Sequence, residues 1–489
     1  MPSDLATLAE QSGTKFILAL FVDLRGKPCA KLVPVESVEL LATEGVGFAG
    51  YAVGAMGQEP KDPDLIAIPD PDSFTPIPFI KEGLALVHCD PHVRGAPWPY
   101  APRVILKGLI QRAADAGFEP WVGAEVEYFL LRRTADGALA TADAADTAAQ
   151  PCYDARGVTR MYEHLTAIST AMNTLGWSNY ANDHEDGNGQ FEQNFEFSDA
   201  LTTADRVITL RYLLSMIAAE RDMVATFMPK PFSDRTGSGL HLHLSLTSGG
   251  TPVFPGDSDE RGLGLSETAY AFIGGILDHA CALQSVVAPT VNSYKRTGAT
   301  WTASGASWAP RKPSYGGNDR THYIRVPDSQ RIELRGGDGS ANPYLAIAAA
   351  LGAGLDGVKR SLDPGAVGAQ GRRPAAHPAP AAHLLHAVES LETDPIVTGV
   401  LDVAGDGVAS YFADVKREEF FAYHAPSRRG KSTNTSLLSR RETTHVRDRG
   451  ATPAHTGAVS AAGRTAGRHA GRDVRPRRRF GRYRGLRRP

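Results

Sequence analysis

The sequence predicts a mixed α+β protein in which helices back a curved antiparallel sheet, and one face of that sheet is polar. Four segments alternate apolar residues with charged or metal-ligating side chains in the two-residue period of a strand. Segments with apolar residues at helical spacing lie between them. The chain has 489 residues, which is more than one hydrophobic core usually supports, so two domains are expected.

The first hundred residues indicate a small sheet domain. Residues 16–34 contain two apolar segments separated by Arg25-Gly-Lys-Pro28, which predicts two strands joined by a turn. The residues that follow, up to about 102, are rich in Pro, Asp and Gly, as in Pro69-Asp-Pro-Asp72. We expect short strands, turns and then a linker there.

The second domain is expected to begin with a helix over residues 103–116, which Gly117 closes. A strand over residues 121–131 follows, with Glu125 and Glu127 on one face because they are two residues apart. After an Ala, Thr and Asp-rich loop at 135–150, residues 159–175 predict a helix. Residues 190–197 predict a second polar-faced strand, and residues 204–224 a long helix.

The clearest strand is Gly237-Ser-Gly-Leu-His-Leu-His-Leu-Ser-Leu246, in which four leucines occupy one face and His241, His243 and Ser245 the other. By itself this strand equally fits a solvated face whose histidines only form hydrogen bonds. Residues 331–335 repeat the pattern with Arg331, Glu333 and Arg335, and residues 340–359 predict a helix. Four such strands, all poor in Lys and Thr, favour a ligand-binding face that lines a cavity.

The composition excludes several classes of protein. The N-terminal residues lack a basic segment followed by a long apolar one, and residues 16–22 are too few to span a bilayer, so no membrane insertion is expected. The four cysteines are far apart in sequence, which argues against a disulfide framework or a thiolate zinc site. We therefore expect a cytoplasmic protein with reduced thiols.

The net charge of -2 conceals an asymmetry between the body and the C-terminal segment. Residues 425–489 contain 18 Lys+Arg and 3 Asp+Glu, which leaves 34 Lys+Arg against 51 Asp+Glu in residues 1–424. An acidic body suits an enzyme that binds divalent cations. It argues against nucleic acid as a partner, unless the basic segment is a binding arm.

The polar face combines carboxylates, one or two imidazoles and guanidinium groups. Several carboxylates close together need cations to remain ionised, and oxygen ligands with one His favour Mg²⁺ or Mn²⁺ over zinc. Arginines beside divalent metals suit the transfer of a phosphoryl group. A Walker-type loop is absent from the sequence, so a nucleotide would have to lie on the sheet. The carboxylates are Glu125, Glu127, Glu185, Glu192 and Glu333, and the arginines are Arg296, Arg320, Arg325, Arg331 and Arg335.

Together these motifs resemble the glutamine synthetase family over about residues 12–424. The resemblance implies a β-grasp domain over residues 12–101, a catalytic domain with a half-barrel sheet over 103–424, and a homo-oligomeric double ring with active sites between subunits. It rests on the order and spacing of Gly123-Ala-Glu-Val-Glu-Tyr-Phe129, His184-Glu185, Gly189-Gln-Phe-Glu192, Met228-Pro-Lys-Pro-Phe232, Gly237-Ser-Gly-Leu-His241, Asn292-Ser-Tyr-Lys-Arg296, Asn318-Asp-Arg320, Ile324-Arg325, Arg331-Ile-Glu333-Leu-Arg335 and Ala341-Asn-Pro-Tyr344.

The resemblance also implies a role for each candidate residue. The metal nearer the acceptor amino acid would be held by Glu127, Glu185 and Glu192, and a second metal, between the nucleotide phosphates, by Glu125, His241 and Glu333. Glutamate would be gripped by Arg296, Arg335 and Gly237, with Glu127 and His241 nearby. The nucleotide would contact Phe197, His243 and Ser245, and its phosphates Arg320, Arg325 and Arg331. Arg296, Arg320 and Arg335 are the implied catalytic arginines. By contrast, Gln190, Asn194, His184 and Lys230 suit structural roles.

The implied reaction transfers the γ-phosphoryl group of ATP to the side-chain carboxylate of glutamate, and an amine then displaces phosphate. Two carboxylates that the family uses around ammonium are missing. The sequence has Phe48-Ala-Gly-Tyr-Ala52 where an Asp is expected and Thr302 where a flap Glu is expected. With Asp183-His-Glu-Asp186, this resembles the type III branch that includes γ-glutamylmethylamide synthetases.

We therefore expect a glutamate-amine ligase that favours a small alkylamine such as methylamine. The alternatives are an ammonia-using glutamine synthetase, a γ-glutamyl-polyamine ligase, and a non-catalytic structural or sensing member of the fold. Retention of the metal candidates and arginines favours an enzyme. The Arg, Gly and Ala-rich segment 425–489 replaces the expected final helix. A frameshift would explain it and would leave a disordered segment, whereas the rival hypothesis is a nucleic-acid-binding arm.

Overall fold

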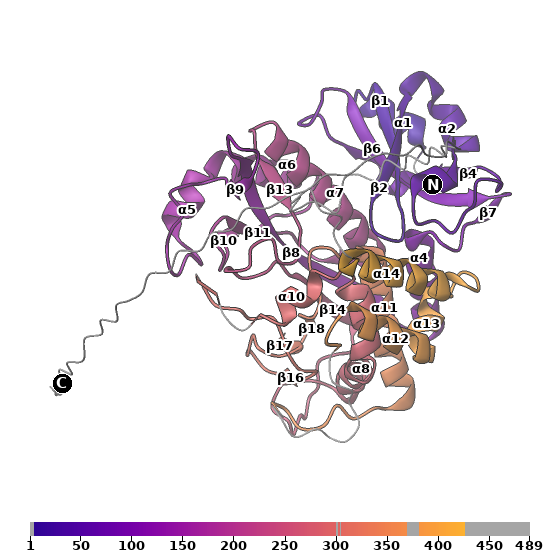
Figure 1. The fold of residues 1–489 in the computed structure, drawn as a ribbon. Helices are drawn as coiled ribbons and strands as arrows, with labels where there is room; N and C mark the ends of the chain where they lie inside the picture. Colours follow the sequence, from indigo (N-terminus) through magenta and orange to yellow (C-terminus); the bar gives the residue numbers. More distant parts are fainter. Residues whose placement is uncertain (1–3, 300–301, 304, 369–380, 426–489) are drawn as a thin grey trace, which may run out of the picture. The chain divides into compact units, whose positions relative to one another are not determined.

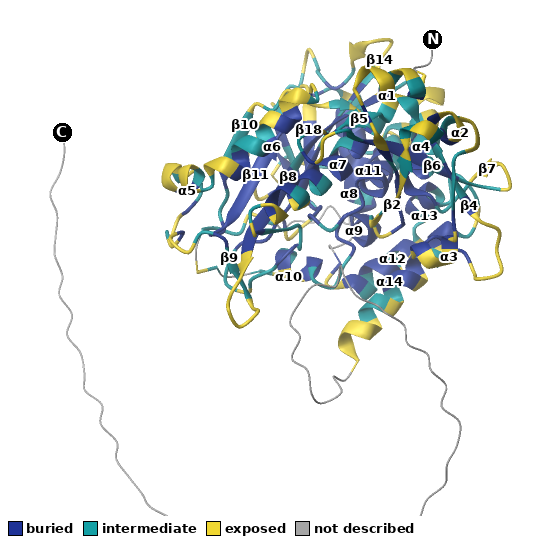
Figure 2. Ribbon diagram, turned by 90° about the horizontal axis from the view of Figure 1, so that it is seen from above, coloured by how far each residue is buried: buried dark blue, intermediate teal, exposed yellow. Residues whose placement is uncertain are grey.

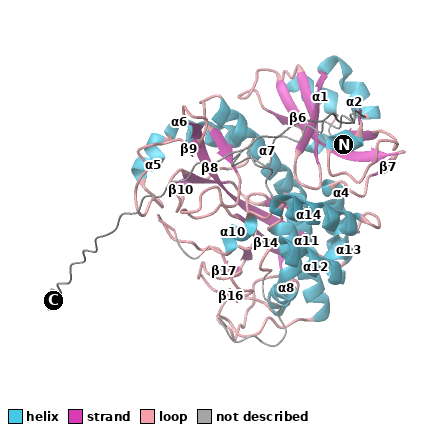
Figure 3. Ribbon diagram, viewed as in Figure 1, coloured by secondary structure: helices cyan, strands magenta, loops and turns pink. Residues whose placement is uncertain are grey.

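The structure is a computed structural model that describes residues 4–299, 302–303, 305–368 and 381–425. A compact unit spans residues 1–426. Figures 1 and 3 show it as an N-terminal sheet with short helices, followed by a long sheet and a group of C-terminal helices. The predicted α+β class is confirmed.

The N-terminal sheet has the order β2-β1-β6-β4-β3, with β5 and β7 paired to β6. The predicted hairpin is confirmed, since β1 and β2 pair antiparallel from Phe16 opposite Pro34 to Val22 opposite Pro28. β1 is also parallel to β6. The elements are α1 (Leu5–Gln11), β1 (Phe16–Val22), β2 (Pro28–Pro34), α2 (Val38–Glu44), β3 (Val46–Phe48), α3 (Gly50–Val53), β4 (Leu65–Pro69), β5 (Thr75–Pro76), β6 (Leu84–Val93) and β7 (Ala96–Pro97).

The second sheet has the order β10-β11-β8-β14-β18-β17-β16, with β9, β12 and β13 paired to β8 and β15 paired to β14. Its strands are β8 (Glu119–Arg133), β9 (Leu139–Thr141), β10 (Ala181–His184), β11 (Gln190–Asn194), β12 (Ser198–Asp199), β13 (Val224–Thr226), β14 (Leu240–Ser248), β15 (Thr251–Pro252), β16 (Tyr315–Gly316), β17 (Ile324–Asp328) and β18 (Arg331–Leu334). The prediction of an antiparallel sheet is wrong at one edge, because β16 is parallel to β17.

Helices cover the apolar face of this sheet. Leu240, Leu242, Leu244 and Leu246 of β14 are buried in the same core as residues of α7, α8 and α11. Much of these three helices is dark blue in Figure 2. The helices are α4 (Pro102–Asp115), α5 (Ala155–Arg160), α6 (Tyr162–Thr174), α7 (Ala200–Ala219), α8 (Glu267–Asp278), α9 (Ala280–Val287), α10 (Ser293–Thr297), α11 (Pro343–Arg360), α12 (Leu384–Thr393), α13 (Pro395–Leu401) and α14 (Val408–His424).

Several predicted boundaries are wrong by a few residues. The helix expected over 159–175 is two helices that meet at Met161, and the expected loop over 135–150 contains β9. The helix expected over 204–224 begins at Ala200, because Asp199 accepts bonds from the Leu201 and Thr202 amides. It ends at Ala219, and β13 follows after a turn. Likewise α11 begins after the capping Asn342 rather than at residue 340.

A buried ion-pair network joins the N-terminal sheet to the helices. The Arg103 guanidinium of α4 contacts Asp70 and Asp90, each at 2.9 Å, and Asp205 of α7 at 3.0 Å. The Tyr344 hydroxyl of α11 donates to Asp205 at 2.5 Å. These contacts fix the N-terminal sheet against α4, α7 and α11. The domain boundary at residues 101–103 remains a prediction.

No single helix among the described residues is long and apolar enough to cross a membrane. The pair α8 and α9 meets the length and composition requirement only together, is bent by 76°, and consists mostly of buried residues. Apart from Ala425, the predicted basic segment at 425–489 lies outside the described residues.

Candidate functional site

The four polar-faced strands lie side by side, in the order β11, β8, β14 and β18. Glu192 of β11 pairs with Glu127 of β8, and Glu125 of β8 pairs with His241 of β14. His243 of β14 pairs with Glu333 of β18. Cross-strand partners have neighbouring Cβ atoms, so the predicted common polar face is confirmed.

Glu125 is the centre of a contact network. Its Oε1 atom lies 2.8 Å from His243 Nε2, and its Oε2 atom 3.0 Å from His241 Nδ1. Burial would raise the pKa of Glu125, but the hydrogen bonds with both histidines outweigh it and hold that pKa well below its usual range. Both imidazoles therefore form hydrogen bonds with the same carboxylate, that of Glu125.

Glu127 is held by neighbouring backbone and side-chain donors. Its Oε2 atom accepts from the Gly239 amide at 2.8 Å and from Gln190 Nε2 at 3.0 Å. A Cβ atom at position 239 would lie 2.6 Å from His241 Nε2 and 3.0 Å from Glu127 Oε1 and Arg296 Nη2. Gly239 therefore permits these three side chains to converge.

Three other carboxylates are destabilised as anions. Burial raises the pKa of Glu185 well above its usual range, and the charges of Glu127 and Asp183 add to the effect. Burial and the charges of Glu125, Glu185 and Glu127 do the same for the pKa of Glu192. Burial raises the pKa of Asp183 to about 6, and Glu125 and Glu127 act in the same direction. The hydrogen-bond donors and cations of the protein therefore do not fully compensate the negative charge of this cluster.

The donor set fits divalent cations. Within the described part of the chain, ligand atoms that lie within 4.8 Å of one another form three groups: Glu125, Glu192 and His241; Glu125, His243 and Glu333; and Cys152, Glu185 and Asp186. Carboxylates with an imidazole suit Mg²⁺ or Mn²⁺. The six predicted metal ligands lie in one region. However, the three groups do not match the two sets of ligands that the resemblance implies. The allocation of ligands to two metals remains a prediction.

Arginines surround Glu333, which is fully buried. Its two oxygens contact Arg325 Nη1 at 2.6 Å and Arg335 Nη1 at 2.5 Å. Burial would raise the pKa of Glu333, but His241 and Arg335 outweigh it and lower that pKa. Arg331 is more exposed and donates from Nε to His243 Nδ1 at 3.2 Å.

Arg296 reaches the same face from α10. It is 4% exposed, and its Nη2 atom donates to the Arg335 carbonyl at 3.4 Å. A Cβ atom at Gly237 would lie 2.8 Å from Arg296 Cγ. The structure thus brings Gly237, Arg296 and Arg335 together, as the resemblance implied.

Three other candidates lie around this cluster. The Arg320 carbonyl accepts from Arg335 Nε at 3.1 Å. Phe197 is 58% exposed, and its ring meets Trp121 edge-on with centroids 6.0 Å apart. Ser245 pairs with Trp121 across β14 and β8. Phe197 and Ser245 therefore share the end of the polar face around Trp121.

The residues expected to be structural have structural contacts. His184 is fully buried and lies 2.8 Å from both Asp146 Oδ2 and the Glu185 carbonyl. The Lys230 amide donates to Asn292 Oδ1 at 2.7 Å, and its ammonium group donates to the Arg235 carbonyl. These contacts orient Glu185 and the loop before Gly237.

Sequence reasoning missed the side chains around Asp186. Trp308 Nε1 donates to Asp186 Oδ2 at 2.6 Å, and Asp186 shares a ligand group with Cys152. Neither Cys152 nor Trp308 has a strand-like spacing that would have revealed this. At the flap position, Thr302 Oγ1 donates to the Gly305 carbonyl at 2.8 Å, so its hydroxyl is bonded within its own loop.

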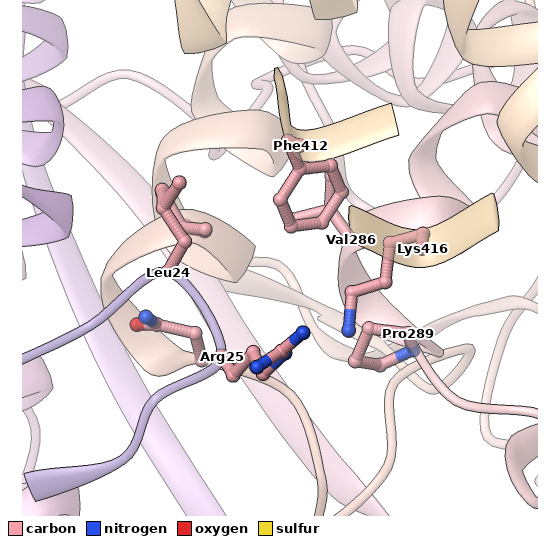
Figure 4. Close-up of a pocket in the computed structure, with 8 residues that line it drawn as sticks. Leu24, Arg25, Val286, Pro289, Phe412 and Lys416 are labelled. Carbon is pink, nitrogen blue, oxygen red and sulfur yellow. The ribbon is translucent and has the colours of Figure 1, made fainter. Parts of the chain in front are cut away.

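Two cavities lie outside this cluster, and none of the candidate residues lines either. The smaller, of about 10 Å³, accommodates one water molecule, and Figure 4 shows Arg25 and Lys416 reaching it from different elements. The larger, of about 460 Å³, is lined by residues that include Asp278, His279 and Asp394. The candidate site is therefore defined by its polar strand face rather than by either cavity.

Comparison with known proteins agrees with this geometry. Residues 99–431 match the model of the glutamine synthetase catalytic domain. The chain is 43% identical over 366 residues to a glutamate-methylamine ligase of Methyloversatilis universalis, covering 75% of this chain and 82% of that protein. It is 44% identical over 365 residues to a glutamine synthetase of Rhizobium meliloti, covering 75% and 83%. A solved GmaS/ADP complex superposes with a TM-score of 0.81 at 44% identity, covering 88% of this chain and 98% of that one.

Proposed function

The chain belongs to the glutamine synthetase family, and from this we propose that it is an ATP-dependent ligase that joins glutamate to a small amine. The product is a γ-glutamyl amide, and methylamine is the favoured nucleophile. The observation that carries this proposal is the single polar face on which Glu125, Glu127, Glu192, His241 and Glu333 meet.

We assign the metals to this face. Glu127, Glu185 and Glu192 would hold one Mg²⁺ or Mn²⁺ ion, and Glu125, His241 and Glu333 would hold a second. Such ions would supply positive charge that neutralises the phosphates during phosphoryl transfer. The raised pKa values of Glu185 and Glu192 support this assignment, because buried neighbouring carboxylates need a cation to remain ionised together.

The arginines position both substrates. Arg296 and Arg335 bind glutamate carboxylate groups, with the Gly237 backbone at the amino end of glutamate. Arg325 and Arg331 neutralise the nucleotide phosphates, and Arg320 lies at the transferring group. The nucleotide rests against Phe197, His243 and Ser245. The Arg325 and Arg335 contacts with Glu333 support this arrangement, because they hold both guanidinium groups on the polar face before substrate binds.

The reaction proceeds in two steps. A γ-carboxylate oxygen of glutamate attacks the γ-phosphorus of ATP, the bond to the bridging oxygen breaks, and ADP leaves. The amine nitrogen then attacks the acyl carbon, phosphate leaves with the bonding electrons, and the nitrogen loses a proton to solvent or a carboxylate. Guanidinium groups stabilise the charge on the transferring phosphoryl group.

The preference for methylamine is supported by two observations. The relatives include a glutamate-methylamine ligase and a GmaS/ADP complex, and the chain has Ala49 and Thr302 where ammonia-using members of the family have carboxylates. A smaller or uncharged side chain in place of a carboxylate leaves room for the methyl group that methylamine has and ammonia lacks.

An ADP-release assay with ATP, glutamate and a divalent cation tests this proposal. We expect kcat/KM to be higher with methylamine than with ammonia, ethylamine or putrescine. A strong preference for ammonia would contradict the methylamine assignment but leave the ligase intact. Absent ADP release with every amine would instead support the non-catalytic alternative.

The active assembly is proposed to be a cytoplasmic homo-oligomer with sites between subunits. The four cysteines, all of them free thiols in the structure, support a reducing compartment. Light scattering at enzyme concentrations tests the assembly, and a monomer with full activity would contradict intersubunit sites.

A further inference from the structure

Gln190 is a fully buried polar side chain on the polar strand face. It is the first residue of β11, and Glu192 lies two residues further along the same face of that strand. Its Nε2 atom lies 3.0 Å from Glu127 Oε2, 3.2 Å from the Gly237 carbonyl oxygen and 3.3 Å from Ser238 Oγ. One amide group thus joins a predicted metal ligand to the loop at which the amino end of glutamate is proposed to bind.

The orientation of the Gln190 amide follows from its neighbours. Its Oε1 atom accepts from the Gly187 amide at 3.0 Å, whereas its Nε2 atom faces acceptors. The reversed orientation would place an oxygen against the Glu127 carboxylate and the Gly237 carbonyl, and a nitrogen against an N–H group. The amide is therefore fixed with both of its hydrogen atoms directed at acceptors.

The backbone of Gln190 holds a second predicted metal ligand. Its carbonyl accepts from the Glu185 amide at 2.9 Å. Glu127 also accepts from the Gly239 amide at 2.8 Å, and this bond and the one from Gln190 both go to Oε2. The other oxygen, Oε1, lies 3.6 Å from His241 Nε2. Gln190 therefore contacts two of the three carboxylates assigned to the metal nearer glutamate.

The Gly237 peptide is closely packed at the other end of this link. The Ser238 amide donates to the Pro229 carbonyl at 2.9 Å, and a Cβ atom at position 237 would lie 2.3 Å from the same carbonyl oxygen. The Gly237 carbonyl oxygen accepts from Gln190. A carbonyl oxygen has two lone pairs, so one remains to accept from the ammonium group of glutamate.

We propose that Gln190 is a positioning residue that couples metal binding at Glu127 to glutamate binding at Gly237. A cation that orders Glu127 also orders the Gln190 amide, and that amide fixes the Gly237 carbonyl. Ordering of one end removes part of the entropic cost of ordering the other, so metal and glutamate each tighten the binding of the other by the same factor. The inference rests on the proposed function, which places a metal at Glu127 and the amino end of glutamate at Gly237.

The substitution Gln190→Met tests this coupling, because it keeps the length of the side chain and removes its hydrogen-bond donor. Electron paramagnetic resonance measures the Kd of Mn²⁺ without and with saturating glutamate, in the absence of nucleotide. In the original protein we expect glutamate to lower that Kd about tenfold. In Gln190→Met the factor should fall to about twofold, carried by the remaining bond from the Gly239 amide to Glu127.

Gln193→Met is the matched control. Gln193 is also a fully buried residue of β11, but it lies on the opposite face of that strand. There it accepts from the Tyr128 hydroxyl at 2.8 Å and donates to the Leu165 carbonyl at 3.0 Å. Gln193→Met should lower the melting temperature as Gln190→Met does, yet keep the full coupling. Equal loss of coupling in both variants would overturn the inference, because it would show a general weakening of β11.

Gln190→Glu is the second variant, because it keeps an acceptor for the Gly187 amide and replaces the donor with oxygen. It should also lose the coupling, and it decides the question if Gln190→Met does not fold. Full coupling in either folded variant would overturn the inference. If glutamate leaves the Mn²⁺ Kd of the original protein unchanged, the inference is wrong and the ligase assignment stands. An original protein that binds neither Mn²⁺ nor glutamate would refute the proposed function as well.

Discussion

The substitution Glu192→Gln separates metal binding from folding. Glu192 is buried, pairs directly with Glu127 across β11 and β8, and accepts from Asn194 Nδ2 at 2.8 Å. A glutamine keeps the shape and that hydrogen bond but removes one negative charge. We therefore expect the metal-free protein to become more stable and the metal-dependent gain in stability to fall.

The expected change in stability follows from the pairing of Glu192 with Glu127. Side chains on directly paired strand residues lie about 5 Å apart, and two like charges at that distance repel by about 3 kcal/mol at an effective dielectric constant of about 20. Loss of that repulsion should raise the melting temperature of the metal-free protein by about 6 °C. In the original protein, Mg²⁺ at about 100 times its Kd should add about 2.7 kcal/mol, or about 5 °C. Most of that gain should be absent in Glu192→Gln.

Thermal melting in EDTA and across a Mg²⁺ or Mn²⁺ titration measures both effects. Glu196→Gln is the matched control, because Glu196 follows the same strand but is exposed, and it should change neither value. If Glu192→Gln destabilises the metal-free protein, or keeps the full metal-dependent gain, the reasoning is refuted.

Three further predictions address the site and its surroundings. His241→Ala should lower kcat at least about 100-fold, whereas His243→Ala should mainly raise KM for ATP, as ADP release over an ATP titration will show. Gly239→Ala should abolish metal-dependent activity, because the added Cβ atom would lie 2.6 Å from His241 Nε2. Gly399→Ala is the control and should keep the activity, because a Cβ atom there would have no other atom within 4 Å. Burial would lower the pKa of His279, but the bonds with Asp394 and Asp356 raise it. That stabilisation is full below about pH 6.5 and is lost as pH rises through the folded pKa, so the melting temperatures of His279→Asn and the original protein should converge as the pH rises above about 6.5.

Local periodicity correctly predicted which side chains share the polar strand face. The two-residue alternation in residues 121–131 and 240–246 placed Glu125, Glu127 and His241 on polar strand faces, and the structure agrees. This succeeded because side-chain direction in a strand depends only on position along it. Helix boundaries were less well predicted, since caps such as Asp199 override propensity.

Long-range contacts could not be predicted in the same way. The sequence placed His241 and His243 on one face, but only the tertiary structure showed that both contact Glu125. The sequence likewise could not reveal that Trp308 donates a hydrogen bond to Asp186. Such contacts depend on loop closure between residues more than a hundred positions apart, which leaves no local pattern.

The sequence by itself determined the family, the polar strand face and the identities of its carboxylates, imidazoles and arginines, because each follows from residue type and short-range spacing. Only the tertiary structure decided the strand order, the parallel edge at β16, and the buried contacts of Arg296 with its neighbours. Those features depend on which hydrophobic surfaces pack together and on which buried charges then meet. A one-dimensional pattern does not specify that balance of burial and charge.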